Sequence, residues 1–352
     1  MFSMAKAPKL RAAGRSWLGG VCLLGGLALT AATILPQASG VAQELKFLRI
    51  ATAASGSTNY DVGGVLASAV SSPPGARPCE KGGSCGVPGL VAVVQTTMGS
   101  NENVRAVTQG QAETALVEAD VAYWAYHGTG SFRDGKAARD LRAIANLFPS
   151  TVHVVVPSAS GVRNIADLRG KRVALGEEGS STAATAKTIL AAYGVPLNDI
   201  GVIHAPPGAA SDLLDGGKID AFFVIAGQPS AIIDDLSRRM SLRLLPIDGT
   251  PGEELKSFYP FFSESVVQAG TYPNVAYTDS VAVSTQWITS TSADDDLVYA
   301  LTAALWHESN RKLFENGHAE VRGIGLETAL DRVAIPLHPG AARFYEEIGL
   351  QR

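Results

Sequence analysis

The 352-residue chain has few of the residues that most often carry metal or covalent chemistry, with 3 cysteines and 6 histidines. The histidines are scattered along the chain without the spacing of a zinc site. No Gly-x-Ser-x-Gly turn joins a predicted strand to a predicted helix, and no phosphate-binding Gly-Lys-Ser/Thr loop occurs. We therefore expect a protein without a metal ion, a cofactor or catalytic activity.

Long apolar runs are absent after the first part of the chain. Residues 1–43 contain four basic residues and no acidic one, and 17–34 is almost wholly apolar or glycine. Small residues follow Pro36 up to Ala42, so we predict a secretory signal peptide over 1–42 and a periplasmic protein that does not span the membrane. A retained membrane anchor is the alternative, because the apolar run is near the lower length limit for crossing a bilayer.

Basic residues are fewer than acidic ones, 29 against 33, and the formal net charge is −4. Cleavage after Ala42 removes four positive charges and moves the net charge to −8. Such an acidic chain argues against nucleic acid as a partner. The length that remains exceeds the size at which a single core stops growing, which predicts two lobes.

Two of the three cysteines, Cys79 and Cys85, lie in a Pro/Gly-rich segment over 71–88. Two neighbouring cysteines in a loop form a disulfide in an oxidising compartment, and we predict one here. A metal site is the other interpretation. It needs more ligands than two thiols, and no histidine lies near them in the sequence.

A strand, a loop of small residues and a helix follow one another twice in a pattern that suits the binding of a polar solute. These elements cover in turn 45–52, 53–59 and 60–70, and again 171–175, 176–182 and 182–193. The backbone N–H groups at the start of such a helix are unpaired and attract an oxyanion. We predict that the two loops face each other across a cleft.

Strands and helices alternate along the rest of the chain, which indicates an α/β fold with a parallel sheet covered on both faces. We expect further strands at 90–96, 112–117, 141–148, 151–157, 219–225, 242–247 and 277–285, and helices at 121–127, 209–215, 229–239 and 294–313. Another helix starts near 100, with Ser100 or Asn101 as its N-cap. Ligands bind beyond the carboxyl ends of such strands, where the predicted loops lie.

The predicted ligand-binding residues lie on these loops: Ser55, Gly56, Ser57, Thr58, Asn59, Tyr60, Asn101, Asn103, Glu118, Gly179, Ser180, Ser181, Thr182 and Gln228. Helix capping is the alternative role for Ser180, Ser181 and Asn101, and a tight turn into a helix is the alternative for the first loop. Gln228 precedes Pro229, which also suits the first turn of a helix. Asp120, close to Glu118 at a strand end, is suited to capping the next helix.

Short motifs along nearly the whole chain after residue 42 match one family: the loop 53–59 before Tyr60, Ser-Asn-Glu-Asn at 100–103, 110–121, 167–176, 179–182, 215–223, 227–229, 270–273, Pro-Leu-His-Pro-Gly at 336–340, and Tyr-Glu at 345–346. In this order they resemble the TAXI-type solute receptors of tripartite ATP-independent periplasmic (TRAP) transporters. One position departs from the family, which usually has Gln-Ser-Asp-Val where this chain has Glu-Ala-Asp-Val at 118–121. Glu118 either alters the charge preference for the ligand or pairs with a nearby base.

The resemblance implies a type II periplasmic-binding-protein fold, with two Rossmann-like lobes joined by hinge strands and a ligand cleft between them. We expect lobe I to comprise 45–152 and 278–352, and lobe II to comprise 153–277. The implied function is a TRAP transporter receptor that binds a small polar or anionic solute, such as glutamate or a related organic acid, and delivers it to the membrane subunits. A receptor for an ABC-type importer or a sensor is the alternative. An enzyme on the same fold is a third hypothesis, which the export signal disfavours.

Overall fold

Two long strands, β6 (Leu141–Pro157) and β12 (Thr278–Ser290), join the two halves of the fold. They lie side by side and antiparallel, and their pairing extends from Leu141 to Thr151 of β6. The computed structural model describes residues 45–55, 57–316 and 321–350. The predicted signal peptide over 1–42 and the predicted site residue Gly56 lie outside the described residues.

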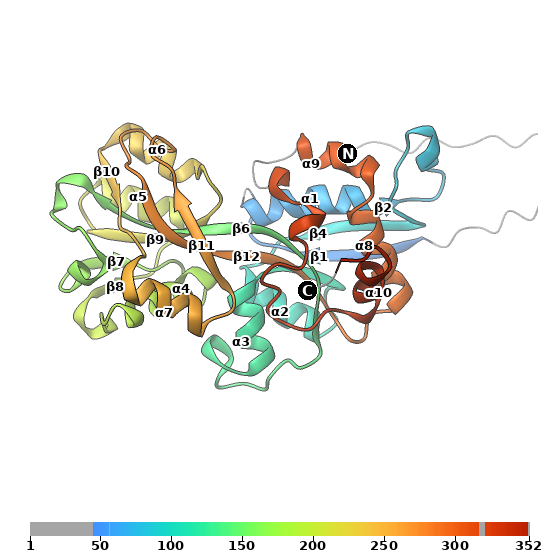
Figure 1. The fold of residues 1–352 in the computed structure, drawn as a ribbon, viewed down its shortest axis with the longest axis horizontal. Helices are drawn as coiled ribbons and strands as arrows, with labels where there is room; N and C mark the ends of the chain where they lie inside the picture. The colour runs from blue at the N-terminus through green and yellow to red at the C-terminus, as the bar shows by residue number, and fades with distance from the viewer. Residues whose placement is uncertain (1–44, 56, 317–320, 351–352) are drawn as a thin grey trace, which may run out of the picture. The chain divides into compact units, whose positions relative to one another are not determined.

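The remaining elements form two lobes, both within one unit, Gln43–Arg352. Lobe I contains β1 (Lys46–Ala51), α1 (Thr58–Val70), β2 (Ser71–Ser72), β3 (Val87–Pro88), β4 (Leu90–Gln95), α2 (Ser100–Thr108), β5 (Thr114–Glu118), α3 (Ala119–His127), α8 (Asp295–Leu305), α9 (Arg311–Glu315) and α10 (Pro339–Glu347). Lobe II contains β7 (Arg172–Ala174), α4 (Ser181–Ala192), β8 (Gly201–Ile203), α5 (Pro207–Asp215), β9 (Ala221–Ala226), α6 (Ala231–Arg239), β10 (Leu242–Leu244), α7 (Gly249–Phe258) and β11 (Phe262–Val267). Figure 1 shows β6 and β12 running between the two groups.

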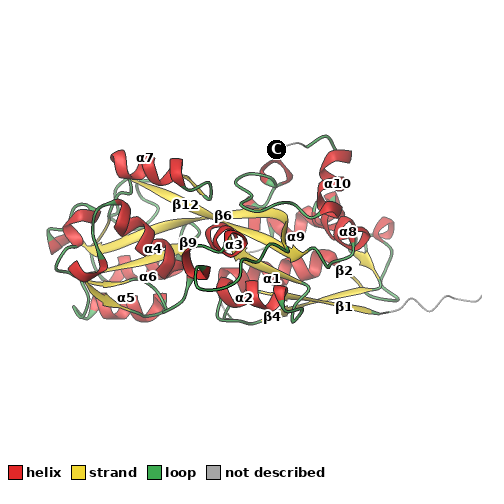
Figure 2. Cartoon of the chain, turned by 90° about the horizontal axis from the view of Figure 1, so that it is seen from below, coloured by secondary structure: helices red, strands yellow, loops and turns green. Residues whose placement is uncertain are grey.

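One mixed sheet extends through both lobes in the order β4-β1-β5-β12-β6-β9-β7-β8, with β10 beside β6 and β11 beside β12. Within each lobe the outer strands are parallel, and helices lie on both sides of them (Figure 2). The central strand β9 reads Ala-Phe-Phe-Val-Ile-Ala and is buried over its first four residues, as expected for a strand covered on both faces. The predicted α/β fold with two lobes and hinge strands is confirmed.

The sheet is mixed rather than parallel as predicted, because β6 and β12 run antiparallel to their neighbours. Residues 141–157 also form one strand rather than the two predicted around Pro149. Pairing with β9 begins only at Thr151, so β6 has a neighbour on one side at Pro149. A proline without an N–H group is tolerated where one side of the strand is unpaired.

The long helix predicted over 294–313 is also wrong, since α8 ends at Leu305. The side chain of Asn310 donates hydrogen bonds to the carbonyl oxygens of Ala69 (3.0 Å) and Ala304 (2.7 Å). One side chain thus satisfies a carbonyl at the end of α8 and one at the end of α1, and the chain turns there instead of continuing as a helix.

The predicted disulfide between Cys79 and Cys85 is confirmed, with 4.7 Å between the two Cα atoms. The expectation that no histidine lies near it holds in the sequence but not in space. His307 places Nε2 3.8 Å from Cys79 Sγ. Because both sulfurs are in the disulfide, neither offers the thiolate that a metal ion needs.

Candidate functional site

Glu118, the last residue of β5, lies where helix N-termini from both lobes meet. From lobe I, Asn59 Nδ2 donates to its carboxylate over 3.4 Å, and the Ser100 hydroxyl donates to the other carboxylate oxygen. The same Ser100 oxygen accepts a hydrogen bond from the Glu118 backbone N–H (3.2 Å). From lobe II, the hydroxyl of Ser181 lies close enough to the Glu118 carboxylate to favour its ionised form. One carboxylate therefore links the two predicted loops.

The helices that start around Glu118 are α1, α2, α3 and α4, and Glu118 is itself the residue before α3. A helix N-terminus carries a positive partial charge, which stabilises an anion. The sequence analysis expected these ends to hold an anionic solute. In the structure these helix ends surround the protein's own carboxylate, Glu118. Burial raises the pKa of Glu118, and the nearby side chains of Asn59 and Ser181 oppose this rise.

A second carboxylate, Asp120, lies two residues further on in the first turn of α3 and has 0% of its surface exposed. The hydroxyl of Thr185, on α4 of lobe II, donates to Asp120 Oδ2. The backbone N–H of Val121 donates to Oδ1 over 2.7 Å. Burial, together with the nearby charge of Glu118, raises the pKa of Asp120 to about 7.

A third polar contact between the lobes involves two predicted site residues. Asn101 Nδ2 on α2 donates to the carbonyl oxygen of Gly179, and Ser131 Oγ donates to Asn101 Oδ1 over 3.1 Å. Gly179 has φ of +78°, a conformation that side-chain-bearing residues rarely adopt. We call the region of these contacts, formed by Glu118, Asp120, Asn101, Gly179, Ser181 and Thr185, the interlobe seam.

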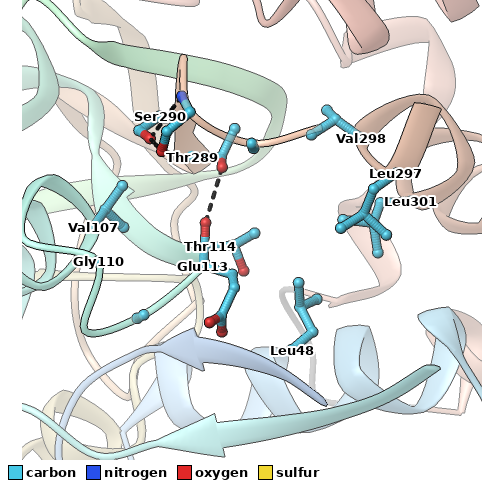
Figure 3. A pocket seen from close by; sticks show the side chains of 13 residues that line it. Leu48, Val107, Gly110, Glu113, Thr114, Thr289, Ser290, Leu297, Val298 and Leu301 are labelled. Atoms are coloured by element: carbon cyan, nitrogen blue, oxygen red, sulfur yellow. Dashed lines mark hydrogen bonds between the residues drawn. The ribbon is translucent and has the colours of Figure 1, made fainter. Parts of the chain in front are cut away.

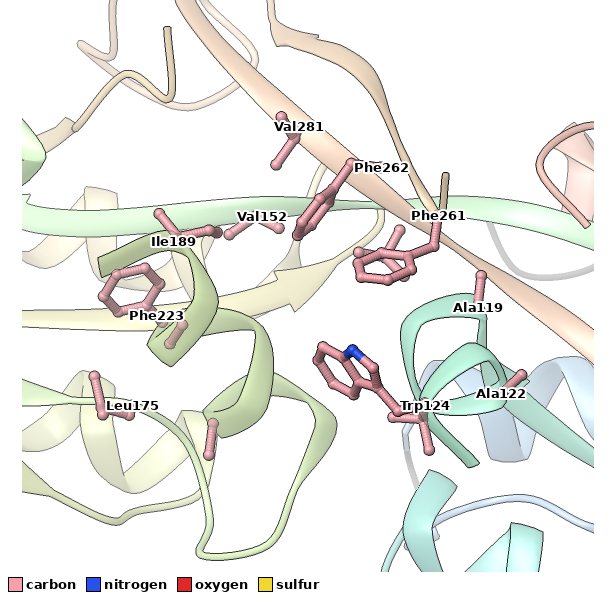
Figure 4. Close-up of a cluster of buried hydrophobic side chains, with 14 of the residues drawn as sticks. Ala119, Ala122, Trp124, Val152, Leu175, Ile189, Phe223, Phe261, Phe262 and Val281 are labelled. Carbon is pink, nitrogen blue, oxygen red and sulfur yellow. The ribbon is translucent and has the colours of Figure 1, made fainter. Parts of the chain in front are cut away.

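An apolar cluster continues the interlobe seam on its buried side. Trp124 of α3 packs edge-on against Phe261, which precedes β11, with 5.5 Å between ring centroids. Figure 4 shows this pair in a cluster that runs on through Phe262 and Val152 to Ile189 of α4. Lobes I and II are therefore in contact through both polar and apolar side chains.

The remaining predicted residues lie close to the interlobe seam, and two of them cap helices. Ser57 is the N-cap of α1 and accepts from the N–H of Tyr60 (3.3 Å), and Ser180 caps α4 by accepting from the N–H of Ala183 (3.1 Å). The N-cap of α2 is Gly99, not Ser100 or Asn101, because Ser100 is already helical and its hydroxyl is bonded to Glu118. Ser55 lies in the loop before α1, Thr58 and Tyr60 lie in the first turn of α1, and Thr182 lies in the first turn of α4.

Two predicted ligand-binding residues, Asn103 and Gln228, use their side-chain amides for hydrogen bonds within the protein. Asn103 is fully buried, and Nδ2 donates to the carbonyl oxygens of Thr52 (2.5 Å) and Leu116 (2.7 Å). Gln228 Nε2 donates to Thr151 Oγ1 of β6 (2.7 Å) and to the carbonyl oxygen of Val266 (3.1 Å). The contacts of Asn103 join the residue after β1 to β5 in lobe I, and those of Gln228 link β6 to β11.

The sequence analysis missed the part that Asp120, Trp124, Thr185 and Phe261 take in joining the lobes. For Thr185 a signal was present, because it lies four residues after Ser181 and therefore on the same face of the predicted helix. For Phe261 no signal was available, since its segment suggested no element and its partner Trp124 is far away in the sequence.

Two pockets lie away from the interlobe seam. The first, of about 230 Å³, is lined by residues that include Leu48, Val107, Glu113, Thr289 and Leu301 (Figure 3). Glu113 there forms an ion pair with Arg49 at 2.5 Å and lies near the start of β5, at the end of the strand opposite Glu118. The second, of about 400 Å³, is lined by parts of 158–163, 242–248 and 274–279 in lobe II. Neither pocket is lined by a predicted ligand-binding residue.

Comparison with known proteins identifies the family to which the chain belongs. A protein-family model described as the NMT1-like family matches residues 50–349. Among solved structures, the chain is similar to a putative sulfonate ABC transporter's periplasmic sulfonate-binding protein SsuA from Methylobacillus flagellatus, with 15% identity and a TM-score of 0.48 over 88% of this chain and 96% of that one.

Two further structures show the same level of similarity. They are the periplasmic aliphatic sulphonate binding protein SsuA from Escherichia coli (14% identity, TM-score 0.43, 87% and 94% coverage) and PhnD1 from Prochlorococcus marinus in complex with methylphosphonate (10% identity, TM-score 0.48, 87% and 99% coverage). In the part of the chain that the structure describes, none of the helices has the length and hydropathy of a membrane span.

Proposed function

Because the chain belongs to the NMT1-like family, we propose that it is a solute-binding receptor that works outside the cytoplasm and catalyses no reaction. It holds one small polar molecule at the interlobe seam and releases it when lobes I and II separate. The observation that carries this proposal is the meeting of helix N-termini from both lobes at Glu118. A solute at this position contacts both lobes at once, which is what hinge closure around a ligand requires.

Glu118 determines the chemistry of the solute in this proposal. Within the described residues no arginine, lysine or histidine forms an ion pair with it, so the nearby base considered in the sequence analysis is not found. An ionised Glu118 repels a second carboxylate 4 Å away by about 4 kcal/mol at an effective dielectric constant near 20. We therefore propose a solute with an amino group that donates to Glu118, and an amino acid such as glutamate fits better than an organic acid without the amine.

The proposed partner is the membrane permease of an importer. We propose an ABC-type importer, the alternative in the sequence analysis, as the partner. The Methylobacillus flagellatus protein is described as the binding protein of a putative transporter of this class. A TRAP permease, implied by the sequence resemblance, is the second candidate. Uptake of the identified solute distinguishes them, because the first class stops when cells are depleted of ATP and the second does not.

The experiment that tests the proposed site is a thermal-shift screen of paired solutes that differ by one amino group, for example glutamate and glutarate. A solute at 100 times its Kd adds about 2.7 kcal/mol to the free energy of unfolding. We expect the amine-bearing member of a pair to stabilise the protein and its partner not to. Analysis of the solute after incubation checks that it is recovered unchanged.

Two variants locate the binding. Glu118→Gln keeps the shape of the side chain and removes its charge, so we expect it to lower affinity for the amine by at least tenfold. The exposed Glu346, on α10, provides the matched control, and Glu346→Gln should leave affinity unchanged. Equal affinity in wild type and Glu118→Gln would contradict the proposed site, and stabilisation by no solute in the screen would contradict the proposed function.

A further inference from the structure

Asp120 is enclosed by both lobes at once. Its side chain has 0% exposed surface, and so has Thr185, which donates to it from α4 of lobe II. Its other oxygen accepts from the backbone N–H of Val121 in lobe I. Separation of the lobes breaks the contact with Thr185 and lets water reach the carboxylate. Closure therefore transfers this carboxylate from water into the protein interior.

Among the residues that the structure describes, no basic side chain forms an ion pair with Asp120. The elements with the most contacts to α3 are α2, α4, β5, β12 and the 3-10 helix Gly130–Phe132. Together with α3 itself they carry the following titratable groups: Glu102 and Arg105 on α2, Lys187 on α4, Glu118 on β5, Asp279 on β12, and Tyr123, Tyr126 and His127 on α3. The segment that follows the 3-10 helix adds Arg139, whose guanidinium lies 4.8 Å from the centre of the Tyr126 ring at the other end of α3. Of these, Glu118 is the charge that acts on Asp120, and it opposes ionisation.

We propose that closure of the lobes takes up a proton at Asp120, so that the receptor closes more readily at mildly acidic pH and opens as the pH rises above neutral. The inference rests on the proposed function, because it concerns a receptor whose lobes separate and close. The proton comes from solvent and binds one carboxyl oxygen, while the carboxyl group still accepts the hydrogen bond from Thr185. The hydrogen bond from Thr185 forms in the same step, as the lobes come together.

The direction follows from the pKa of Asp120 in the two states. In the closed form the pKa is about 7, and in the open, hydrated form it is the ordinary aspartate value of about 3.9. A group whose pKa is higher in the closed state favours closure fully below the open-state value, and this effect is lost as the pH rises through 7. Between about pH 4 and 7, each pH unit changes the ratio of closed to open molecules by up to tenfold.

The test follows lobe separation by small-angle X-ray scattering of the exported protein, without added solute, from pH 5 to 8.5. We expect the radius of gyration of wild type to increase as the pH rises through about 7. Asp120→Asn has nearly the same shape and no charge, so it should keep a small radius throughout. Asp61→Asn, an exposed position in the first turn of α1, is the matched control and should behave as wild type.

A second measurement covers the case in which Asp120→Asn does not fold. Carbon NMR of the side-chain carboxyl groups in wild type gives the pKa of Asp120 directly, and the inference expects about 7. An ordinary aspartate value, or a radius of gyration that does not change with pH, would overturn the inference. A protein that binds a solute but shows no pH-dependent opening contradicts this inference alone. One that opens with pH but binds none of the screened solutes contradicts the proposed function.

Discussion

Asn103 and Glu118 show how two side chains predicted for the same role differ once the chain is folded. Asn103 lies inside lobe I, where its amide satisfies two carbonyl oxygens and accepts from Thr97 Oγ1 over 2.6 Å. Glu118 lies at the contact between lobes and is bonded by side chains from both. A sequence shows that both residues follow strands, but it does not show which way each side chain points.

His153, in β6, carries a prediction at the scale of a single residue. It is buried, Nε2 lies 3.0 Å from the hydroxyl of Tyr272, and burial lowers its pKa to about 4. The unfolded chain binds a proton near pH 6.5, so the folded protein loses stability as the pH falls from 6.5 toward 4. We expect His153→Gln to reduce this loss, as measured by urea unfolding at pH 7.5 and pH 5.

The result that would contradict this prediction is an equal change in unfolding free energy with pH for wild type and His153→Gln. The exposed His127→Gln provides the control, because it lies on the surface of α3 and should leave the pH dependence as in wild type. Asp120 acts in the opposite direction over part of the same range, so the comparison is made between variants rather than on wild type alone.

At the scale of elements, the sequence predicted the start of α1 to within two residues and that of α4 to within one, because both starts depend on local signals. Ser57 and Ser180 are the N-caps, and each accepts from a backbone N–H three residues ahead. Elements whose bounds depend on contacts with distant parts of the chain were predicted less well. The end of α8 depends on Asn310 reaching Ala69, 241 residues away in sequence, and 249–268 gave no clear pattern although it forms α7 and β11.

The same caps give a prediction that separates stability from binding. Ser57→Ala and Ser180→Ala each remove one bond to a helix N–H, so we expect each to lower the free energy of unfolding by about 1 kcal/mol. Ser181→Ala leaves the cap of α4 intact and removes the donor to Glu118, so its main effect should be on solute affinity. Urea unfolding and a binding titration on the three variants check this. Equal losses of stability in all three would refute the distinction.

At the scale of the whole molecule, the pairing order of the sheet was not predictable from sequence because it joins segments far apart. β12 returns to pair with β5 and β6, and its contact with β5 matches Thr285 to Glu118. The end of β5, and with it Glu118, is therefore held directly against a strand that continues into lobe II. The sequence predicted a connecting strand at 277–285, but β12 extends to Ser290 and carries this additional pairing.

Hydrogen exchange tests how the lobes move. We expect amides of β6 and β12 to exchange slowly at both pH 5.5 and pH 8, because their ladder stays intact in the closed and the open form. Amides in the first turn of α4 should be less protected at pH 8 than at pH 5.5, each compared with the intrinsic exchange rate at that pH, because separation of the lobes exposes them to water. Rapid exchange along β6 and β12 at pH 8 would show that the molecule opens by breaking the sheet.

The continuous pairing of β6 with β12 also limits the paths by which the protein can change shape. Two strands joined edge to edge resist sliding and stretching, since either motion breaks a row of hydrogen bonds together, whereas the ribbon bends across its flat face at little cost. In the proposed receptor, bending of this ribbon is then the movement that separates lobe I from lobe II, and a solute enters on the side of the ribbon where the interlobe seam lies.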